Sequence, residues 1–545
     1  MNKIAHYLQE HLTGEVMTSN EARKYFSTDA SILTVTPSVI VYPRNENDIR
    51  KAARFTWQLA ERGRVIPITA RGSGTDQAGA AIGSGIIMVF PAHMRHLLDI
   101  DGKTGAITVE PGINYGKLQQ ALHTHHRFLP PYPASQEYST IGGAIGNNAA
   151  GEKTFKYGCT RDYVKSLRVV LANGEVIETH RLSKRELNKK LGLATFEGEI
   201  YRNLDTLIEE NKDTISSIRR AVTKNSSGYA LDQVKRKDGS FDLTPLLVGS
   251  QGTLGIVSEA VLETEPYSPN TTLVAAFFDD LQVAEEALLE IQRMPELPSA
   301  IEAVDKNVLE LVSQHNPNLL KDAFEGAFPK LVLLIEFDNP SERTQKRMTK
   351  KVEKILSHYQ VTHQTETEAH KQEQLWKIRQ LAAVVAGHNE NGAKAIPMIE
   401  DGVVPLDKFK EYLDSVYLLF EKNGLKATLW GHAGNANLHI QPFLNLAEIG
   451  DRQKVFRLLE DYYDLVLKLG GSITGEHGDG RMRAPYVAKM YGEEVFELFA
   501  KTKQMFDPYG TLNPGVKIGS NLEDIKPLLR QEYSIQDLLQ HLPGS

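Results

Sequence analysis

A run of small residues from Ser139 to Gly151 constrains the fold of this chain more than any other segment. It reads Ser-Thr-Ile-Gly-Gly-Ala-Ile-Gly-Asn-Asn-Ala-Ala-Gly, and so few bulky side chains cannot fill a hydrophobic core. Bare backbone of this kind suits an extended ligand, because glycine permits close approach while serine and asparagine form hydrogen bonds. A glycine-rich surface loop without a ligand is the alternative interpretation.

A second glycine-rich segment, Arg71–Thr75, follows a short apolar strand and reads Arg-Gly-Ser-Gly-Thr. The backbone amides of such a turn can converge on a phosphate group. The spacing differs from the Gly-x-Gly-x-x-Gly fingerprint of Rossmann folds, so a tight turn without a ligand is an equal alternative. No other segment of the chain carries this dinucleotide-binding fingerprint either, which argues against NAD as an electron acceptor.

Length and charge limit the class of protein. A chain of 545 residues exceeds what one hydrophobic core supports and predicts two or more domains. The net charge of -7 argues against nucleic-acid binding, which usually needs a basic stripe. The single cysteine, Cys159, excludes an intrachain disulfide and a cysteine-ligated cluster. Without a signal-like segment or an apolar run of ~18 residues, we expect a cytoplasmic protein, with peripheral contact to the inner face of the membrane left open.

The pattern of predicted secondary structure changes at Pro266–Asn270. Before this segment, short strands alternate with glycine-rich loops and helices, as in an α/β unit. After it, apolar strand-like segments such as Thr271–Phe278 and Leu331–Phe337 alternate with charged helix-like segments. The pattern predicts a separate α+β domain with Pro266–Asn270 as its linker.

Two histidine-bearing segments near the C-terminus, 431–439 and 475–481, indicate chemistry. We expect His432 and His439 to lie directly opposite each other in a hairpin whose turn centres on Asn435 and Ala436. Opposed Cβ atoms lie about 4.5–5.5 Å apart, close enough for both imidazoles to share a metal ion. Glu476 would complete a site for zinc, manganese or iron. A satisfied turn histidine and a core-facing strand histidine are the alternative.

The ordered motifs of the first half resemble the FAD-binding domain of the vanillyl-alcohol-oxidase/PCMH flavoprotein family. The second half resembles the FAD-linked oxidase C-terminal domain of D-lactate, D-2-hydroxyglutarate and glycolate dehydrogenases, and the likeness covers about residues 30–518. The motifs that carry the first likeness are Thr36–Ile49, Ala70–Thr75, Val109–Gly112, Ser139–Gly151, Tyr157–Asp162, Lys224–Tyr229 and Gly249–Val257.

This resemblance implies an α+β fold in which a PCMH-type FAD-binding domain of two α/β subdomains is joined to a substrate (cap) domain with an antiparallel sheet covered by helices. The implied units are an N-terminal helical extension (1–30), the FAD-binding domain (31–267), the cap domain with the metal site (268–480) and a C-terminal helical segment that returns to the FAD-binding domain (481–545).

The resemblance also implies which residues hold FAD. Arg71–Thr75 and Ser139–Gly143 would hold the pyrophosphate, while Asn147, Ala150 and Gly252–Ile256 would line the adenosine and isoalloxazine parts. The position of Cys159 does not match the covalent attachment sites of the fold, and a single cysteine is usually a buried small hydrophobe. The implied set is Arg71, Gly72, Ser73, Gly74, Thr75, Pro133, Ser135, Ser139, Thr140, Gly142, Gly143, Asn147, Ala150, Gly252, Gly255, Ile256 and Asn513.

The implied reaction is the FAD-dependent oxidation of a small D-2-hydroxy acid to the 2-oxo acid, with D-lactate as the first expectation. His477 matches the general base, and we expect it to point away from the ion that Glu476 binds. Arg379 matches the arginine that binds the substrate carboxylate, although an exposed helix arginine is the alternative. Lys394 is a candidate second cation, and Asn437 would hydrogen-bond the substrate or the flavin.

The chain departs from the family in its turn, where Asn435-Ala436 replaces the usual Asp-Gly. Alanine tolerates positive φ poorly, and the lost aspartate removes a carboxylate that can orient a metal ligand. We therefore expect an altered turn with intact metal ligands.

The resemblance implies an electron acceptor such as a quinone, a cytochrome or an electron-transfer flavoprotein, and allows a homodimer. Alternatives remain a D-2-hydroxyglutarate or glycolate dehydrogenase, an alkylglycerone-phosphate-synthase-like flavoenzyme, and a non-catalytic partner subunit.

Overall fold

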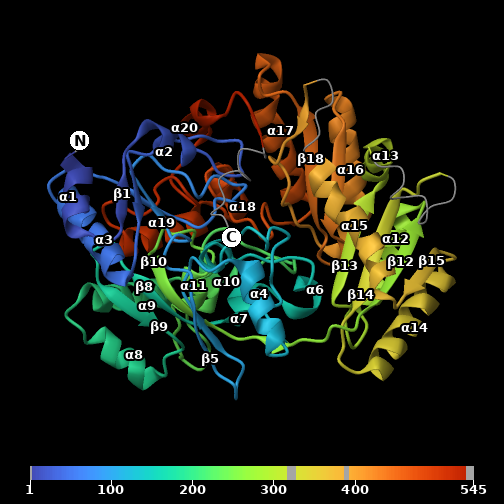
Figure 1. The fold of residues 1–545 in the computed structure, drawn as a ribbon, viewed down its shortest axis with the longest axis horizontal. Helices are drawn as coiled ribbons and strands as arrows, with labels where there is room; N and C mark the ends of the chain where they lie inside the picture. The colour runs from blue at the N-terminus through green and yellow to red at the C-terminus, as the bar shows by residue number, and fades with distance from the viewer. Residues whose placement is uncertain (1–2, 316–326, 386–391, 535–545) are drawn as a thin grey trace.

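The computed structural model describes residues 3–315, 327–385 and 392–534 and arranges them around three larger β-sheets (Figure 1). The first sheet has the order β1-β2-β4-β3, in which β4 pairs in parallel with β2 and β3. Its strands are β1 (Glu15–Met17), β2 (Val39–Tyr42), β3 (Ile68–Arg71) and β4 (Ile86–Val89).

The second sheet has the order β5-β6-β10-β8-β9 and is antiparallel throughout. Its strands are β5 (Leu97–Ile100), β6 (Ile107–Val109), β8 (Val164–Val170), β9 (Val176–Thr179) and β10 (Ile256–Leu262). A small pair joins β7 (Arg127–Phe128) to β11 (Glu265–Pro266). The helices of this half include α1 (Lys3–His11), α2 (Asn20–Tyr25), α3 (Glu46–Ala60), α4 (Tyr115–Thr124), α6 (Thr154–Tyr157), α7 (Thr160–Tyr163), α8 (Lys184–Leu191), α9 (Phe196–Glu210), α10 (Lys212–Ser216) and α11 (Thr244–Leu247).

The small-residue run forms a short helix flanked by loops rather than a plain surface loop. Helix α5 covers Ile141–Asn147, and the Thr140 side chain caps its N-terminus by accepting the Gly143 N–H. The apolar residues Ile141 and Ile145 face the core. The helix ends at Asn148, whose φ of 55° is left-handed. Gly142 and Gly143 lie between these apolar positions and are not buried in the core.

The seven-stranded antiparallel sheet has the order β15-β12-β14-β13-β17-β18-β16 and lies at the right in Figure 1. Its strands are β12 (Thr272–Phe278), β13 (Ala300–Asp305), β14 (Leu331–Phe337), β15 (Thr362–Glu366), β16 (Lys394–Ala395), β17 (Ala427–His432) and β18 (Asn437–Leu444). This element pattern confirms the predicted mixed fold with a helix-covered antiparallel sheet.

Helices cover both faces of this sheet because strand side chains alternate between faces. Leu273 and Val304 pack against residues of α13 (Lys306–His315) and α15 (Ala369–Val385). Their neighbours Val274 and Ala303 belong to the larger core, which includes residues of α12 (Leu281–Gln292), α14 (Glu342–His358), α16 (Phe409–Lys422) and α17 (Ile449–Lys468). The face toward α15 carries the polar residues described below.

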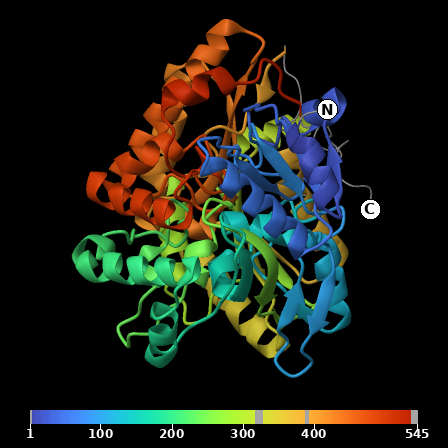
Figure 2. The same cartoon turned by 90° about the vertical axis from the view of Figure 1, so that its left-hand side faces the viewer.

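The C-terminal part of the chain returns to the first half. Helix α19 (Glu493–Phe506) packs against α9, and Figure 2 shows these red and green helices side by side. Leu512 forms a bridge with Ile68 of β3. The segment also contains α18 (Val487–Tyr491) and α20 (Leu522–Ile525), whereas 535–545 lie outside the described residues. The unit boundaries at 30, 267 and 480 stay predictions.

Among the described residues, we find no helix with both the length and the apolar character that crossing a bilayer would require.

Candidate functional site

A cavity of about 910 Å³ is lined by the glycine-rich segments of the first half and by the α15 side of the seven-stranded sheet. With the exception of Asn513, every residue that the family resemblance implied for FAD lines it. Added Cβ atoms at Gly146 and Gly252 would meet no atom closer than 3.8 Å, so both glycines leave bare backbone. The Ser139 hydroxyl is buried and has no hydrogen-bond partner among the described residues. These features fit a long polar ligand such as FAD.

Asn513 does not line the cavity but forms hydrogen bonds to residues that do. Its side-chain NH2 donates to the Ala80 and Gln251 carbonyls, and its amide oxygen accepts a hydrogen bond from Thr69. Cys159 does not line the cavity either, and burial raises the pKa of its thiol.

The hairpin register differs from the predicted register. His432 pairs with Asn437, and His439 pairs with Trp430, so the two histidines are diagonal neighbours rather than directly opposed. The turn contains a 3-10 segment, Ala433–Asn435, followed by Ala436 with φ 49° and ψ 37°. The predicted turn centre at Asn435-Ala436 was therefore wrong by one residue, and the predicted pairing of His432 with His439 was wrong as well.

The diagonal arrangement nevertheless brings the predicted metal ligands together. Partners in an antiparallel ladder share a face, so His432, Trp430 and His439 all project toward α15. His432 Nε2 lies 3.4 Å from His439 Nε2 and 3.0 Å from Glu476 Oε1. His439 Nε2 lies 3.4 Å from the same Glu476 oxygen. Two imidazoles and one carboxylate converge on one point, which is a donor set suited to a divalent metal.

Charged neighbours hold Glu476 ionised despite its burial. Burial raises the pKa of a carboxyl group, but His432 and Lys224 outweigh it and hold the pKa of Glu476 well below its usual range. Lys224 Nζ donates to Glu476 Oε2 at 2.7 Å. The other oxygen of Glu476 faces the two histidines. Glu476 is thus an ionised ligand with one oxygen free of the lysine.

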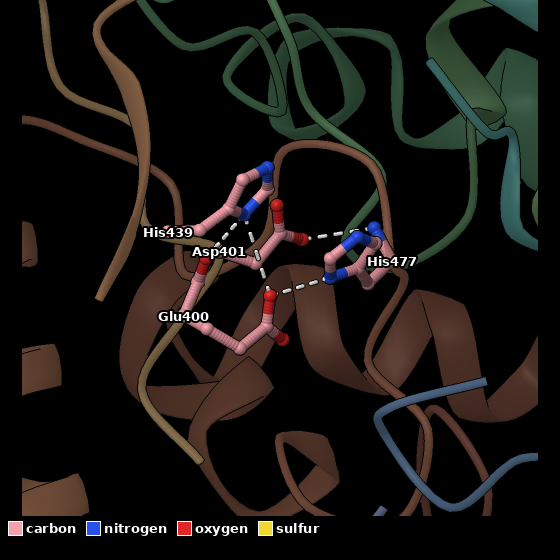
Figure 3. A group of neighbouring side chains, drawn as sticks. All are labelled: Glu400, Asp401, His439 and His477. Carbon is pink, nitrogen blue, oxygen red and sulfur yellow. Dashed lines mark hydrogen bonds and ion pairs between the residues drawn. The ribbon is translucent and has the colours of Figure 1, made fainter. Parts of the chain in front are cut away.

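A second group of acids and histidines adjoins the first, and Figure 3 shows the Glu400 side chain reaching toward both His439 and His477. The guanidinium of Arg483 donates to Glu400 Oε1. The Asp401 carboxylate accepts the backbone N–H groups of Glu476 and His477, at 3.1 and 2.9 Å. These carboxylates are already engaged with a cation and a loop, so this group supports the first cluster rather than forming a second metal centre.

His477 lies beside the ligand cluster, with one nitrogen turned away from it. Its Nδ1 is 2.6 Å from Glu400 Oε2, and its Nε2 is 3.7 Å from Glu476 Oε1. The ring stacks on that of His439, and it lines the cavity. Burial lowers the pKa of His477, but the charges of Glu400 and Asp401 outweigh it and raise the pKa to about 9.

His439 experiences the same competition. Burial lowers its pKa, whereas hydrogen bonds to Glu400 and Glu476 raise it to about 10. A divalent cation among these groups would displace their protons, because metal ligands bind in the deprotonated form.

Arg379 is buried rather than exposed on its helix, and it lines the cavity. Its Nε donates to Glu302 Oε2 at 2.8 Å, and Glu302 Oε1 lies 2.6 Å from His432 Nδ1. Burial raises the pKa of Glu302, but His432 and Arg379 outweigh it and lower the pKa to about 2. The guanidinium therefore has an ionised partner on one side and the cavity on the other.

The remaining two predicted substrate residues behave differently from each other. Lys394 lines the cavity, and its ammonium donates to the Tyr533 carbonyl at 2.7 Å. Asn437 is fully buried and does not line the cavity. Its amide accepts from Lys224 and donates to Asp401 and Gly402, so it braces the site instead of meeting a ligand there.

Sequence reasoning missed Glu302, Glu400, Asp401 and Lys224. Each of the three acids sits in an apolar stretch, Ser-Ala-Ile-Glu-Ala-Val-Asp or Ile-Pro-Met-Ile-Glu-Asp-Gly-Val-Val. Charged residues are seldom fully buried unless paired, so an acid inside an apolar strand was the available signal. Lys224 gave no comparable signal.

Two family models match the chain. The model described as FAD binding domain matches residues 37–180, and the model described as FAD linked oxidases, C-terminal domain, matches residues 268–516.

Curated relatives match nearly the whole chain. D-2-hydroxyglutarate dehydrogenase of Escherichia coli is 31% identical over 94% of this chain and 51% of its own length, so this chain spans about half of that relative. Glycolate oxidase subunit GlcD of Bacillus subtilis is 30% identical over 91% of this chain and 92% of its own length. D-lactate dehydrogenase of Archaeoglobus fulgidus is 27% identical over 88% of this chain and 90% of its own length.

Solved structures share the fold at low identity. p-Cresol methylhydroxylase with bound substrate gives a TM-score of 0.69 at 15% identity, over 96% of this chain and 97% of that chain. Alkyldihydroxyacetonephosphate synthase gives 0.64 at 16% identity, over 94% and 84%. The PCMH-type fold is confirmed, and with both family models and a relative, GlcD, that is 30% identical over 92% of its own length, the chain belongs to the FAD-linked oxidase family.

Proposed function

We propose that this chain is an FAD-dependent dehydrogenase that oxidises a small D-2-hydroxy acid to the 2-oxo acid with the help of a divalent metal. One observation carries the proposal: His439, Glu476, His477 and Arg379 line the same cavity as the small-residue backbone. Two of the three metal ligands, a base and a cation thus line the same cavity as glycine-rich backbone that fits a dinucleotide.

The metal would be held by His432, His439 and Glu476, and FAD by the glycine-rich segments. When bound, FAD supplies a two-electron acceptor, and zinc, manganese or iron supplies a Lewis acid that lowers the pKa of the substrate hydroxyl. Oxidation of a secondary alcohol to a ketone releases two electrons and two protons, so the protein must also accept a proton.

His477 would accept the hydroxyl proton in its deprotonated form. Although burial lowers its pKa, Glu400 and Asp401 raise the pKa to about 9 in the metal-free chain, and a divalent cation at the adjoining ligands would favour the deprotonated form. Glu400 lies 2.6 Å from Nδ1, which leaves Nε2 for the substrate. A carboxylate at Nδ1 fixes the tautomer and stabilises the imidazolium that forms. Asp401 holds the backbone of the same loop, so the base is oriented from two sides.

Arg379 would bind the substrate carboxylate. Within the described part of the chain, the guanidinium makes its one hydrogen bond through Nε to Glu302. Its two Nη groups are left to form a bidentate pair with a carboxylate. A 2-hydroxy acid carries hydroxyl and carboxylate on adjacent carbons, and Arg379 and His477 line the same cavity.

D-Lactate is our first candidate substrate because a monocarboxylate needs one cation in the cavity. Lys394 already donates to the Tyr533 carbonyl. D-2-Hydroxyglutarate is the second candidate, since its distal carboxylate would use the remaining donors of Lys394. Glycolate is the third. The electron acceptor would be a quinone, a cytochrome or an electron-transfer flavoprotein.

Anaerobic stopped-flow absorbance of the FAD-loaded chain tests this proposal. We expect D-lactate to bleach the flavin and L-lactate to leave it oxidised, with D-2-hydroxyglutarate and glycolate ranking the alternatives. Failure of all three candidate acids to reduce the flavin would contradict the proposed function.

The His477→Ala variant tests the assigned base. We expect the flavin spectrum to be retained while reduction slows by about 10²–10⁴-fold, the usual contribution of a positioned base. His123→Ala is the matched control, because His123 stacks on Tyr267 and does not line the cavity. Loss of FAD from His477→Ala would show instead that His477 supports the cofactor.

A further inference from the structure

One carboxylate, that of Glu302, touches both the proposed metal site and the proposed substrate arginine. Glu302 lies on β13, the strand that pairs with β17, and its ladder partner is His432. Its side chain is fully buried on the face toward α15, where Arg379 lies. The two carboxylate oxygens are shared out, Oε1 to His432 and Oε2 to Arg379.

The contact with His432 decides which nitrogen of that ring faces the metal ligands. Glu302 Oε1 lies 2.6 Å from Nδ1, and Nε2 faces Glu476 and His439 at 3.0 and 3.4 Å. A carboxylate at one imidazole nitrogen keeps a proton there and leaves the lone pair on the other. Glu302 therefore directs the His432 lone pair toward the cluster.

The contact with Arg379 fixes the plane of the guanidinium. Nε donates to Glu302 at 2.8 Å, and a guanidinium is rigid and planar, so this bond sets the direction of both Nη groups. Arg379 comes from α15, whereas His432 comes from the sheet. Glu302 is thus a bridge of two hydrogen bonds between a helix and a strand.

We propose that Glu302 is a positioning residue that fixes the metal ligand His432 relative to the carboxylate-binding Arg379, and so couples metal binding to substrate binding. This inference rests on the proposed function. The substrate hydroxyl and carboxylate are on adjacent atoms, so the groups that bind them must be held in a fixed relation. Shared contact with one ionised carboxylate supplies that relation.

The test measures binding rather than turnover, in the FAD-loaded chain. Zinc affinity is measured by equilibrium dialysis, and oxalate affinity by the change in the flavin spectrum, without zinc and with saturating zinc. In the native chain we expect zinc to tighten oxalate binding tenfold or more. This ratio of oxalate affinities is the coupling between the two sites.

Glu302→Gln keeps the shape of the side chain and removes its charge. We expect zinc affinity to fall by about 10–100-fold, as when a partner of a metal ligand is lost. We also expect the coupling to fall to about twofold or less. A residue with a merely structural role would weaken binding but leave the coupling ratio unchanged.

Asp305→Asn is the matched control. Asp305 is a buried carboxylate on the same strand β13, and its oxygens accept hydrogen bonds from Val308 and Tyr417 instead of from a site residue. We expect this variant to keep both the zinc affinity and the coupling. If Glu302→Gln behaved like Asp305→Asn, the role assigned to Glu302 would be overturned.

Arg379→Met keeps the inference testable should Glu302→Gln fail to fold. Without the positive charge of Arg379, the Glu302 carboxylate interacts with His432 alone. We therefore expect zinc to bind threefold or more tightly, and the coupling to disappear. Unchanged zinc affinity would overturn the inference. A native chain that bound no zinc would instead contradict the proposed function, which separates the two failures.

Discussion

At the residue scale, the burial of Asp305 gives one measurable consequence of the fold. Asp305 directly precedes α13, and its Oδ1 accepts the Val308 N–H at 3.0 Å, as an N-cap residue does. The side chain is almost fully buried. Burial raises the pKa of Asp305 from 3.8 to about 7. The folded chain therefore keeps a proton that the unfolded chain releases between these two values.

This difference makes stability depend on pH in a defined direction. Between about pH 4 and pH 7 the folded state binds more protons, so the Asp305 contribution to the free energy of unfolding decreases as pH rises. Asp305→Asn keeps the cap oxygen and cannot ionise. We expect its stability relative to the native chain to rise by about 2–4 kcal/mol across that window and to level off above it.

Urea unfolding from about pH 4 to about pH 9 measures the difference between the two proteins. Asp414→Asn is the control, because Asp414 is exposed and pairs with Lys410 on the surface. A stability difference for Asp305→Asn that did not change with pH would contradict the assignment.

The site residues that sequence could identify are those whose types and spacing are local. His432, His439 and Glu476 were predicted as one ligand set and do converge. Glu302 was missed because it is 130 positions from His432, and only the β13–β17 register places them in contact. A buried acid becomes recognisable as a site residue once its strand partner is known.

At the element scale, the β17–β18 hairpin tolerates an unusual turn residue. Ala436 occupies the left-handed region and is fully buried. Left-handed backbone costs alanine about 1–2 kcal/mol, whereas its buried methyl group contributes about 0.8 kcal/mol. The two effects nearly cancel, so the replacement of the family's Asp-Gly costs this hairpin little.

Two substitutions at Ala436 separate backbone strain from side-chain volume. We expect Ala436→Gly to change the free energy of unfolding by no more than about 1 kcal/mol and to leave zinc affinity unchanged. Ala436→Val places a β-branched side chain at positive φ in a packed site, and we expect a loss of about 2–3 kcal/mol.

Thermal unfolding and zinc dialysis of both variants check this expectation. The valine variant should also bind zinc more weakly, because Ala436 directly precedes Asn437, the ladder partner of His432. Equal losses of zinc affinity in the glycine and valine variants would show that the turn depends on the alanine itself.

At the scale of the whole molecule, buried charges join the two halves of the chain that line the cavity. Lys156 belongs to α6, and Lys153 directly precedes this helix. At the end of β14, Lys153 pairs with Glu336 and Asp338, and Lys156 pairs with Asp338. The Tyr157 hydroxyl donates to Asp338 at 3.1 Å. Burial would raise the pKa of Asp338, but Lys153 and Lys156 outweigh it and lower the pKa.

The family resemblance carried by the ordered motifs predicted the fold class and the helix-covered antiparallel sheet, because each motif can be recognised from a local pattern of glycines or apolar residues. The motifs could not predict this ion cluster, whose members are more than 180 positions apart. A lysine in Gly-Glu-Lys-Thr and an acid in Ile-Glu-Phe-Asp read individually as surface charges. Their burial follows only from how one half packs against the other.

Lys153→Met tests whether this cluster joins the two halves. The substitution leaves the buried Glu336 without a cation, while Asp338 loses one of its two lysines. Breaking a buried ion pair lowers the free energy of unfolding by about 3–5 kcal/mol. Lys156→Met is the matched comparison. Lys156 is partly exposed, with 22% of its side chain accessible, so we expect a loss of no more than about 1 kcal/mol.

The measurement follows urea unfolding by backbone circular dichroism and FAD release by flavin fluorescence. In the native chain the two signals should change together, because the cavity needs both halves. In Lys153→Met we expect FAD release at lower urea than unfolding, since the halves separate first. Adding Glu336→Gln to Lys153→Met should recover part of the loss by removing the unpaired charge. Equal stability of Lys153→Met and Lys156→Met would mean that packing alone, rather than this cluster, holds the cavity together.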